Sequence, residues 1–426
     1  MNKSEPLFHI VKRKNMPVKK QMLVRLIALA VAVVVCAIVT VITTKMNPLA
    51  VFVAVFTGAF GSARKIWITL QDTAILLIIS LALTPAFKMK FWNIGGEGQV
   101  LIGGLASAAC MIVLGDKIPD PVLVLLMLVS SVLIGAIWGL IPAIFKAKWN
   151  TNETLATLMM NYIAIQIVAF FTIYWEVPKG SGKIGIINQT TNAGWLFQIG
   201  NKYLLTILIA IIATIGMFVY LKFTKQGYEI AVVGESEMTA RYAGIRSGWV
   251  IIRTMVISGG LCGLAGFLLV GSIHHTITTT LAGGEGFTAV MVSWLAQFNP
   301  IAMMGASLLI IFLSHGASQI STSCGLNQSF GDIITGIILF FIIGCEFFIR
   351  YQIVFKKGKK AAPEAAVEKT SGEKEAEIPE KDGTSEKEET SGPGPAEAFE
   401  TVGENTAESS REEIKEDTAE GKEEQK

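Results

Sequence analysis

The chain has 426 residues, of which 51% are hydrophobic and 16% charged, and its mean hydropathy is +0.52. This composition excludes an ordinary soluble enzyme, a disulfide-stapled secreted domain and a coiled coil, and it predicts a polytopic membrane protein. The net charge of +2 is the sum of a basic body, residues 1–360 with a net charge of +15, and an acidic tail, residues 361–426 with −13. The overall charge therefore indicates no binding of nucleic acid.

Transmembrane helices are predicted wherever about 20 mostly apolar residues follow one another, the length that crosses a bilayer. The first, 23–43, follows the basic segment 1–22, is long for a signal-peptide core and lacks a cleavage site, so we expect it to be retained. The stretch 47–61 is too short and glycine-rich for a span and is expected at the outer interface. The other clear runs are 72–88, 97–115, 121–145, 153–175, 202–222, 250–271 and 331–352.

Two further apolar runs, 285–298 and 300–315, are shorter and are separated by Asn299-Pro300. Proline lacks the backbone N–H that continues a helix, so this dipeptide predicts broken or half-spanning helices packed inside the bundle. Together the runs predict an all-α membrane domain of about ten helices over residues 23–353.

The distribution of lysine and arginine predicts the orientation of these helices. With ten spans and an inner N terminus, 21 basic residues fall on inner segments and 7 on outer ones. Because basic loops are retained in the cytoplasm, we expect both termini there; that the membrane is a bacterial cytoplasmic membrane is implied only by the sequence resemblance given below.

The region after the last span, 354–426, is rich in Glu, Lys, Ser, Thr, Gly and Pro and poor in aromatic residues. Such a composition cannot bury enough apolar surface to fold alone. We expect a disordered, acidic cytoplasmic tail, which acts either as a solvated spacer or as a strand that folds back on the basic inner face.

A tetrapeptide occurs twice, as Gly95-Gly96-Glu97-Gly98 and as Gly283-Gly284-Glu285-Gly286. Each copy opens an apolar, small-residue-rich segment that a proline break ends. In the ten-span topology the two copies begin helices of opposite direction, five helices apart, which is the arrangement of inverted five-helix repeats.

Carboxylates inside a membrane cost about 2.5–3.5 kcal/mol on insertion scales, so the two glutamates require an explanation. Either they line a polar path, or each caps its own helix, where the positive end of the helix dipole favours a negative charge. An amide facing lipid would lack partners, so Asn161 is expected to face the bundle interior. The residues that we predict to line the substrate path are Asn93, Glu97, Gln99, Asn161 and Glu285.

No constellation typical of an enzyme occurs, and no cofactor is expected. Gly180-Ser181-Gly182-Lys183 resembles part of a phosphate-binding loop, but Val177 and Ile184 stand where that motif needs glycine and a hydroxyl residue. The adjacent His274 and His275 have no third ligand at metal spacing. The five cysteines show no CxxC spacing, so we interpret them as apolar packing residues.

The longest inner segment whose composition indicates ordered structure is 225–248. Residues 235–245, bounded by Gly234 and Gly244, predict a short helix with one polar side. It suits a docking helix for a cytoplasmic partner. The alternative is an interfacial helix on the anionic inner leaflet, for which only Arg241 and Arg246 argue.

Four strings together resemble the permease subunits of ABC importers of the branched-chain amino acid and simple-sugar group, most closely the nucleoside-type members. They are FWNIGGEGQVLIGG (91–104), NETLATLMMNYIA (152–164), GYEIAVVGESEMTARYAGI (227–245) and GLAGFLLVGSIHHT (263–276). The resemblance implies alternating access in a subunit that pairs with a second, related permease, expected to form a heterodimer. It also implies a cytoplasmic ATP-binding subunit, which hydrolyses ATP, and an extracellular substrate-binding lipoprotein. The family's coupling helix matches 227–245, which places the coupling residues at Glu237, Ala240, Arg241 and Gly244.

Two functions remain open at this point. The first is an ATP-driven importer of nucleosides or of a related simple sugar, and the second is an ion-coupled secondary transporter of a small polar solute. Trp92, Tyr162, Phe171 and Trp294 would stack equally well on a base or on a sugar, so the residues do not separate these substrates.

Overall fold

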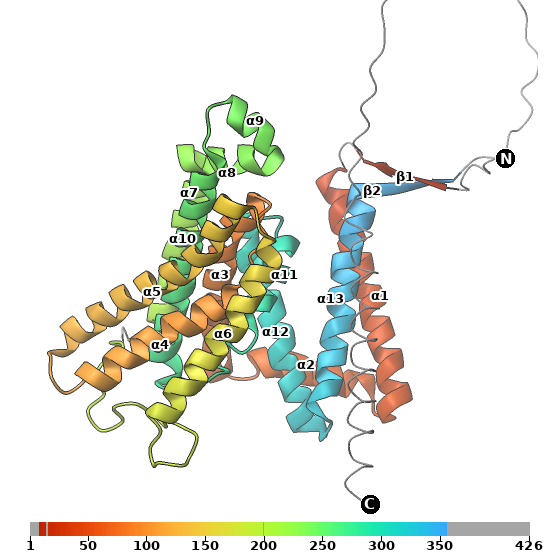
Figure 1. Ribbon diagram of the computed structural model, residues 1–426. Helices are drawn as coiled ribbons and strands as arrows, with labels where there is room; N and C mark the ends of the chain where they lie inside the picture. The colour runs from red at the N-terminus through yellow and green to blue at the C-terminus, as the bar shows by residue number, and fades with distance from the viewer. Residues whose placement is uncertain (1–7, 14–15, 199, 356–426) are drawn as a thin grey trace, which may run out of the picture. The chain divides into compact units, whose positions relative to one another are not determined.

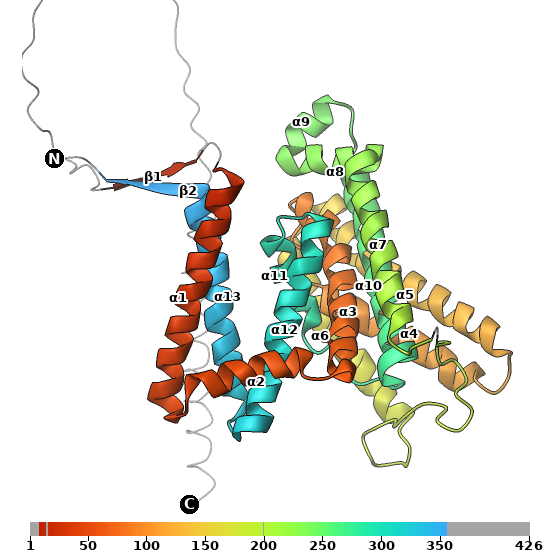
Figure 2. The same ribbon diagram turned by 180° about the vertical axis from the view of Figure 1, so that it is seen from behind.

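The protein is described here from a computed structural model, which covers residues 8–13, 16–198 and 200–355. The predicted tail lies outside these residues, except for its first two positions. Nine of the described helices are long and apolar enough to cross a membrane. The predicted all-helical membrane architecture is therefore confirmed, and Figures 1 and 2 show the arrangement of its helices.

Eight of the spans correspond to the eight clear apolar runs. They are α1 (Val18–Thr44), α3 (Ala63–Lys88), α4 (Gly96–Leu114), α5 (Asp120–Trp149), α6 (Glu153–Tyr174), α7 (Leu204–Phe223), α10 (Ser247–Leu268) and α13 (Gln328–Arg350). One turn of π-helix, η1 (Leu269–His274), extends α10.

The ninth span, α12 (Pro300–Cys324), corrects the prediction of a short helix over 300–315. Polar residues from His315 onward end the apolar run in the sequence, but the helix continues because these residues have partners within the bundle. His315 contacts Asp72 on α3, and Gln319 accepts a hydrogen bond from Lys65. A side chain with a protein partner does not have to leave the membrane.

Two short helices complete the bundle. α11 (Glu285–Leu295) has 11 residues, so it spans about 16 Å, roughly half of a 30 Å hydrocarbon core. It is the predicted half-spanning helix. α2 (Pro48–Phe60) begins at Asn47, whose side chain accepts the N–H of Leu49, and it lies crosswise to α1 and α3 in Figures 1 and 2.

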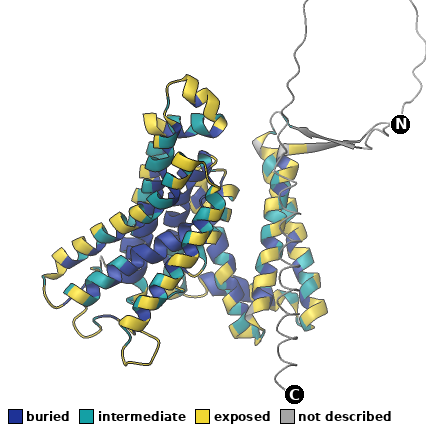
Figure 3. Cartoon of the chain, in the orientation of Figure 1, coloured by how far each residue is buried: buried dark blue, intermediate teal, exposed yellow. Residues whose placement is uncertain are grey.

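The core of the bundle surrounds α3. In the most apolar window of α3, 72% of the residues are buried, compared with 17% for α1. Figure 3 shows that the buried residues are concentrated on α3, α4 and α10. The apolar side chains of α1 that the rest of the chain does not cover would face lipid in a membrane. The five cysteines are free, and three of them are buried, which agrees with their interpretation as packing residues.

Close helix contacts within the core depend on small residues. Gly263 of α10 lies against the backbone of Ser131 on α5, where an added Cβ would overlap a carbonyl oxygen. Ser131 Oγ in turn donates to the carbonyl oxygens of Gly103 and Gly263, at 2.8 and 2.6 Å. These contacts join α4, α5 and α10 at the distance that small residues allow in membrane bundles.

A feature that the sequence did not predict is a two-stranded antiparallel sheet. β1 (Phe8–Lys12) pairs with β2 (Tyr351–Phe355), so that the segment before α1 meets the segment after α13. The two ends of the described bundle therefore lie on one side. We call this side the α8–α9 end, because it also carries α8 (Lys225–Glu235) and α9 (Glu237–Tyr242). The opposite side, with the loop 175–203, is the loop end.

Candidate substrate path and coupling site

The two Gly-Gly-Glu-Gly motifs meet inside the bundle. Glu97, at the start of α4, accepts the N–H of Gly284 on Oε1 at 2.9 Å and the N–H of Gly286 on Oε2 at 2.8 Å. Its carboxylate therefore caps α11, and neither of the two predicted roles, lining a path or capping its own helix, describes this contact. The backbone N–H groups at the start of a helix lack partners within the helix, and an anion stabilises them.

The second motif needs its glycines for this contact. Gly283 and Gly284 have positive φ angles of 56° and 81°, a conformation that residues with a Cβ rarely adopt. Gly286 lies so close to Glu97 that an added Cβ would overlap its backbone. α4 and α11 run in opposite directions from this junction, as inverted repeats require; a full repeat symmetry stays a prediction.

The predicted amide residues stabilise the turn before α4. Asn93 Nδ2 donates to Ser258 Oγ at 3.1 Å, and Asn93 Oδ1 accepts the N–H of Gly95 at 3.0 Å and Gln99 Nε2 at 3.4 Å. Asn161, which is buried, accepts the N–H of Gly98 and donates to the carbonyl oxygen of Ile94, both at 2.9 Å. Four of the five predicted path residues thus position the α4 junction, and a direct contact with substrate stays a prediction for them.

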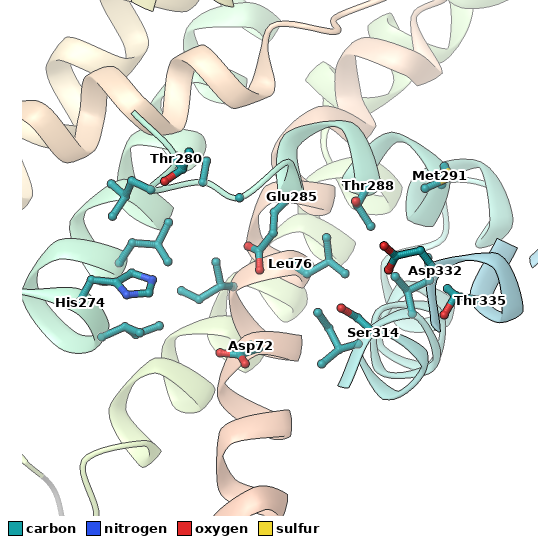
Figure 4. A pocket seen from close by; sticks show the side chains of 18 of the residues that line it. Asp72, Leu76, His274, Thr280, Glu285, Thr288, Met291, Ser314, Asp332 and Thr335 are labelled. Carbon is teal, nitrogen blue, oxygen red and sulfur yellow. The ribbon is translucent and has the colours of Figure 1, made fainter. Parts of the chain in front are cut away.

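A cavity of about 470 Å³ lies beside this junction, between α3, η1, α11, α12 and α13 (Figure 4). Glu285, the fifth predicted path residue, points into it in Figure 4, and its Oε2 atom is buried without a hydrogen-bond partner among the described residues. The polar side chains that line the cavity are Asp72, His274, Thr280, Glu285, Thr288, Ser314, Asp332 and Thr335.

Asp72 and Asp332 were not predicted as site residues. Asp72 lies at the first position of a predicted span, and Asp332 lies at the second position of another. At such a position a carboxylate is interpreted as marking the polar end of an apolar run. In the structure Asp72 lies within α3 and its Oδ2 is 3.0 Å from Nε2 of His315 on α12. His315 Nδ1 is 2.9 Å from Thr69 Oγ1, so His315 bridges two positions of α3.

A second cavity, of about 560 Å³, opens next to the first toward the loop end; we call it the vestibule. Asp72, Ile273 and His274 line both cavities. The loop 175–203 packs beside the vestibule, where Trp195 stacks on His275 with ring centroids 3.8 Å apart. Polar side chains thus line two adjoining cavities between the loop end and the middle of the bundle.

The phosphate-loop resemblance at 180–183 has a different structural explanation. The carboxylate of Glu176 accepts the N–H groups of Gly180 and Gly182, at 2.7 and 2.8 Å. These hydrogen bonds hold the pKa of Glu176 below its ordinary value. The backbone donors that a phosphate would use are therefore occupied by a side chain of the same loop.

The predicted coupling segment forms two helices instead of one helix over 235–245. Ser236 separates them, because its hydroxyl accepts the N–H of Thr239 and caps α9. Arg253 of α10 forms a salt bridge with Glu229 of α8 at 3.0 Å, and Gly234 packs against the backbone of Lys88 at the end of α3. α8 is thus attached to two core helices.

The four predicted coupling residues differ in their contacts and in their exposure to solvent. Glu237 accepts hydrogen bonds from Ser247 of α10 at 2.9 Å and from Arg241 at 3.0 Å. Ala240 is fully buried, whereas the side chain of Arg241 is 67% exposed, and Gly244 forms the turn after α9 with a φ of 74°. Ala240 therefore cannot contact a partner directly. The largest apolar side chains that α9 presents to the surface are Met238 and Tyr242, and Arg241 is exposed beside them in the sequence.

Sequence comparisons identify this architecture. Residues 65–343 match the family model described as branched-chain amino acid transport system / permease component. The chain belongs to this permease family. The matched residues run from the beginning of α3 into α13 and include the α8–α9 segment, the whole lining of the cavity and that of the vestibule except Arg64. Membership favours the permease interpretation over the ion-coupled transporter.

Several relatives of the permease align with most of its chain. It is 30% identical over 326 residues to the nucleoside ABC transporter permease protein NupB of Lactococcus lactis, which is 74% of this chain and 89% of that protein. It is 28% identical over 315 residues to the guanosine ABC transporter permease protein NupP of Bacillus subtilis, 72% and 88% of the two chains. The glucose ABC transporter permease protein TsgB13 of Haloferax volcanii is 27% identical over 315 residues, 71% and 81% of the two chains.

Proposed function

We propose that the protein is the permease subunit of an ABC importer that carries nucleosides, or a related simple sugar, into a bacterial cell. The observation that carries this proposal is the polar route formed by the vestibule and the adjacent cavity within a bundle of the permease family. The names of the relatives support nucleosides first and a sugar second. The ribose of a nucleoside presents the same kind of hydroxyl groups as a sugar does.

Transport would proceed by alternating access around this route. Asp72 and His274 line both cavities, so a shift of α3 against η1 would open or close the passage between them. α3 and α10 are the helices to which α8 is attached through Lys88 and Arg253. A force applied to α8 and α9 would therefore reach the helices that bound the cavities.

A separate cytoplasmic ATP-binding subunit would apply this force, and the permease itself would carry out no catalysis. The exposed Met238, Arg241 and Tyr242 of α9 form the proposed contact. Basic residues at this end, among them Lys88, Lys222 and Arg241, support its cytoplasmic location and, with it, two cytoplasmic termini. An extracellular substrate-binding lipoprotein would then deliver the solute at the loop end.

A second, related permease is the proposed neighbour in the membrane. Gln166 lies near the middle of α6 and its side chain is exposed, between Tyr162 and Phe170. Lipid cannot satisfy the hydrogen bonds of an amide. A partner protein that covers this face of α6 would do so, as the proposed heterodimer requires.

Reconstituted transport tests the proposal. The permease would be purified with the ATP-binding subunit and the second permease, inserted into vesicles, and supplied with the binding protein and radiolabelled uridine, guanosine or glucose. We expect ATP-dependent uptake of a nucleoside. Uptake of branched-chain amino acids with no nucleoside uptake would refute the substrate assignment.

The variant Arg241→Glu tests the coupling contact in the same vesicles. It reverses the charge that α9 presents to the ATP-binding subunit, so we expect ATP hydrolysis to continue while uptake falls at least about tenfold. Lys148→Glu is the matched control, because Lys148 is an exposed basic residue at the same end but lies on α5. Normal coupling in Arg241→Glu would show that α9 is not the contact.

A further inference from the structure

The cavity of Figure 4 has a lining that selects by charge. Three carboxylates line it, those of Asp72, Glu285 and Asp332, together with the hydroxyl groups of four Thr and Ser side chains, and no lysine or arginine is among the lining residues. We propose that this cavity binds a neutral or cationic solute through the solute's hydroxyl or amino donors, with Glu285 as the principal acceptor, and that it excludes phosphorylated solutes. This inference rests on the proposed function and defines the substrate class.

Glu285 carries the proposal because the fold does not use its carboxylate. The neighbouring Glu97 binds Gly284 and Gly286 with both oxygens, so the start of α11 is already capped. Glu285 Oε2 is buried and has no partner within the part of the chain that the structure describes. A buried carboxylate without a donor is costly, and a hydroxyl or amino group of a solute in the cavity would remove that cost.

The other two carboxylates, those of Asp72 and Asp332, add to the discrimination against phosphorylated solutes. Asp72 is bound from the side by His315 of α12, so His315 orients it without lining the cavity. Asp332 is exposed on α13 and adds a negative charge to the opposite wall. A phosphate group placed between these residues would meet like charges at short range, which repel it.

The vestibule differs from the cavity because basic residues line it in addition to Asp72, which places the selection step in the cavity. Arg64 and Lys202 line the vestibule and are absent from the lining of the cavity. A phosphorylated solute would therefore be tolerated in the vestibule and rejected in the cavity, where Glu285 and Asp332 have no lysine or arginine beside them among the lining residues. A divalent metal ion does not explain the carboxylates, since no group of three or more His, Cys, Asp or Glu within the described residues could hold one.

Cysteine modification measures this selectivity directly. Thr288→Cys places a thiol in the cavity, and the parent chain, with its own five cysteines, gives the background. In the purified complex we expect a cationic methanethiosulfonate reagent to react at least about tenfold faster than an anionic one of similar size. Adding Glu285→Gln should lower this ratio severalfold, whereas the control Asp116→Asn, an exposed carboxylate outside the cavity, should leave it unchanged.

Protection against modification then tests the solute class. Uridine should slow the reaction of Thr288→Cys while uridine monophosphate does not, and ribose and ribose 5-phosphate form a second matched pair. Equal protection by both members of a pair, a faster anionic reagent, protection by neither neutral solute, or no modification at all would each overturn the proposal. If Glu285→Gln does not yield a folded complex, Asp332→Asn, at an exposed position, provides the change in charge.

The result of the cysteine-modification experiments can be distinguished from the result of the uptake assay that tests the proposed function. Uptake of nucleosides by the reconstituted importer with equal reactivity toward both reagents would retain the function and refute the acidic selection site. Strong preference for the cationic reagent, with protection by ribose and no nucleoside uptake, would retain the selection site and refute the nucleoside assignment.

Discussion

Glu97 Oε2 accepts the backbone N–H of Gly286 at 2.8 Å, and this hydrogen bond joins two identical tetrapeptides through residues that lie 189 positions apart in the chain. Together with the bond from Gly284 it attaches the half-spanning α11 to the start of α4. α11 begins inside the bundle, where water cannot satisfy its first N–H groups. The carboxylate of Glu97 replaces the water that a helix at a protein surface would have.

Glu97→Gln tests the importance of this carboxylate. A glutamine retains one acceptor oxygen and brings an NH₂ group toward a backbone donor, so we expect a loss of stability of about 1–3 kcal/mol. Thermal unfolding of the detergent-solubilised protein measures it. Glu285→Gln is the control, since its Oε2 has no partner to lose among the described residues. Equal melting temperatures for the wild type and Glu97→Gln would contradict the capping role.

Gly286→Ala tests the close approach of the two motifs. The new Cβ would overlap the backbone of Glu97, and overpacking of this kind costs about 1–3 kcal/mol. Gly305→Ala on α12 is the matched control, because nothing lies within 4 Å of its added Cβ and alanine favours a helix over glycine by about 0.5–1 kcal/mol. We expect the first variant to melt below and the second at or above the wild type. The reverse order would refute the packing argument.

A double-mutant cycle of Asp72→Ala and His315→Ala measures the link between α3 and α12. The side chains are 3.0 Å apart and only 29% and 24% exposed, so we expect a coupling free energy of about 0.5–1.5 kcal/mol from the unfolding of the two single variants and the double variant. Additive effects would show that His315 does not bind Asp72. A measured coupling would also explain why α12 continues past its apolar segment.

The attachment of α9 to α10 should depend on pH. The hydrogen bond from Ser247, together with Arg241, lowers the pKa of Glu237 below its ordinary value. A carboxyl group whose pKa is lowered in the folded state contributes stability above the unfolded value, about 4.3, and that contribution is lost as the pH falls through the folded value. We therefore expect hydrogen exchange in α9 to be slow at neutral pH and to accelerate, relative to α8, below about pH 4.

Ser247→Ala provides the comparison for this pH effect. It removes the main donor to Glu237, so exchange in α9 should already be faster at neutral pH and should change less on acidification. An identical pH profile in the wild type and in Ser247→Ala would rule out Glu237 as the source.

Most spans could be predicted from local composition, because an apolar run of about 20 residues has few stable alternatives to a transmembrane helix. The prediction was wrong for the last part of α12, residues 316–324, where the polar residues after Ser314 indicate a loop unless their partners on α3 are known. The strands β1 and β2 were missed for a related reason: each is five residues long and exists only through the other.

The candidate site, like the fold, could be predicted from the sequence only in part. The repeated motif indicated Glu97 and Glu285, but the two identical glutamates differ in role, since Glu97 caps α11 and Glu285 faces the cavity. Asp72 and Asp332 could not be assigned because their contribution depends on which faces of α3 and α13 turn toward α11. In the predicted coupling segment, the burial of Ala240 and the hydrogen bond from Ser247 to Glu237 could be known only from the packing against α10.

By itself, the sequence determined that this protein crosses the membrane many times, that its matching strings resemble an importer permease, and that glycine-flanked carboxylates lie within apolar helices. These are local properties, set by the hydration cost of each segment. Only the tertiary structure decided which carboxylate is bound by backbone N–H groups and which remains available to a solute. That difference arises because a hydrogen bond or a cavity requires two helices at a definite distance, and the order of residues in one helix does not define that distance.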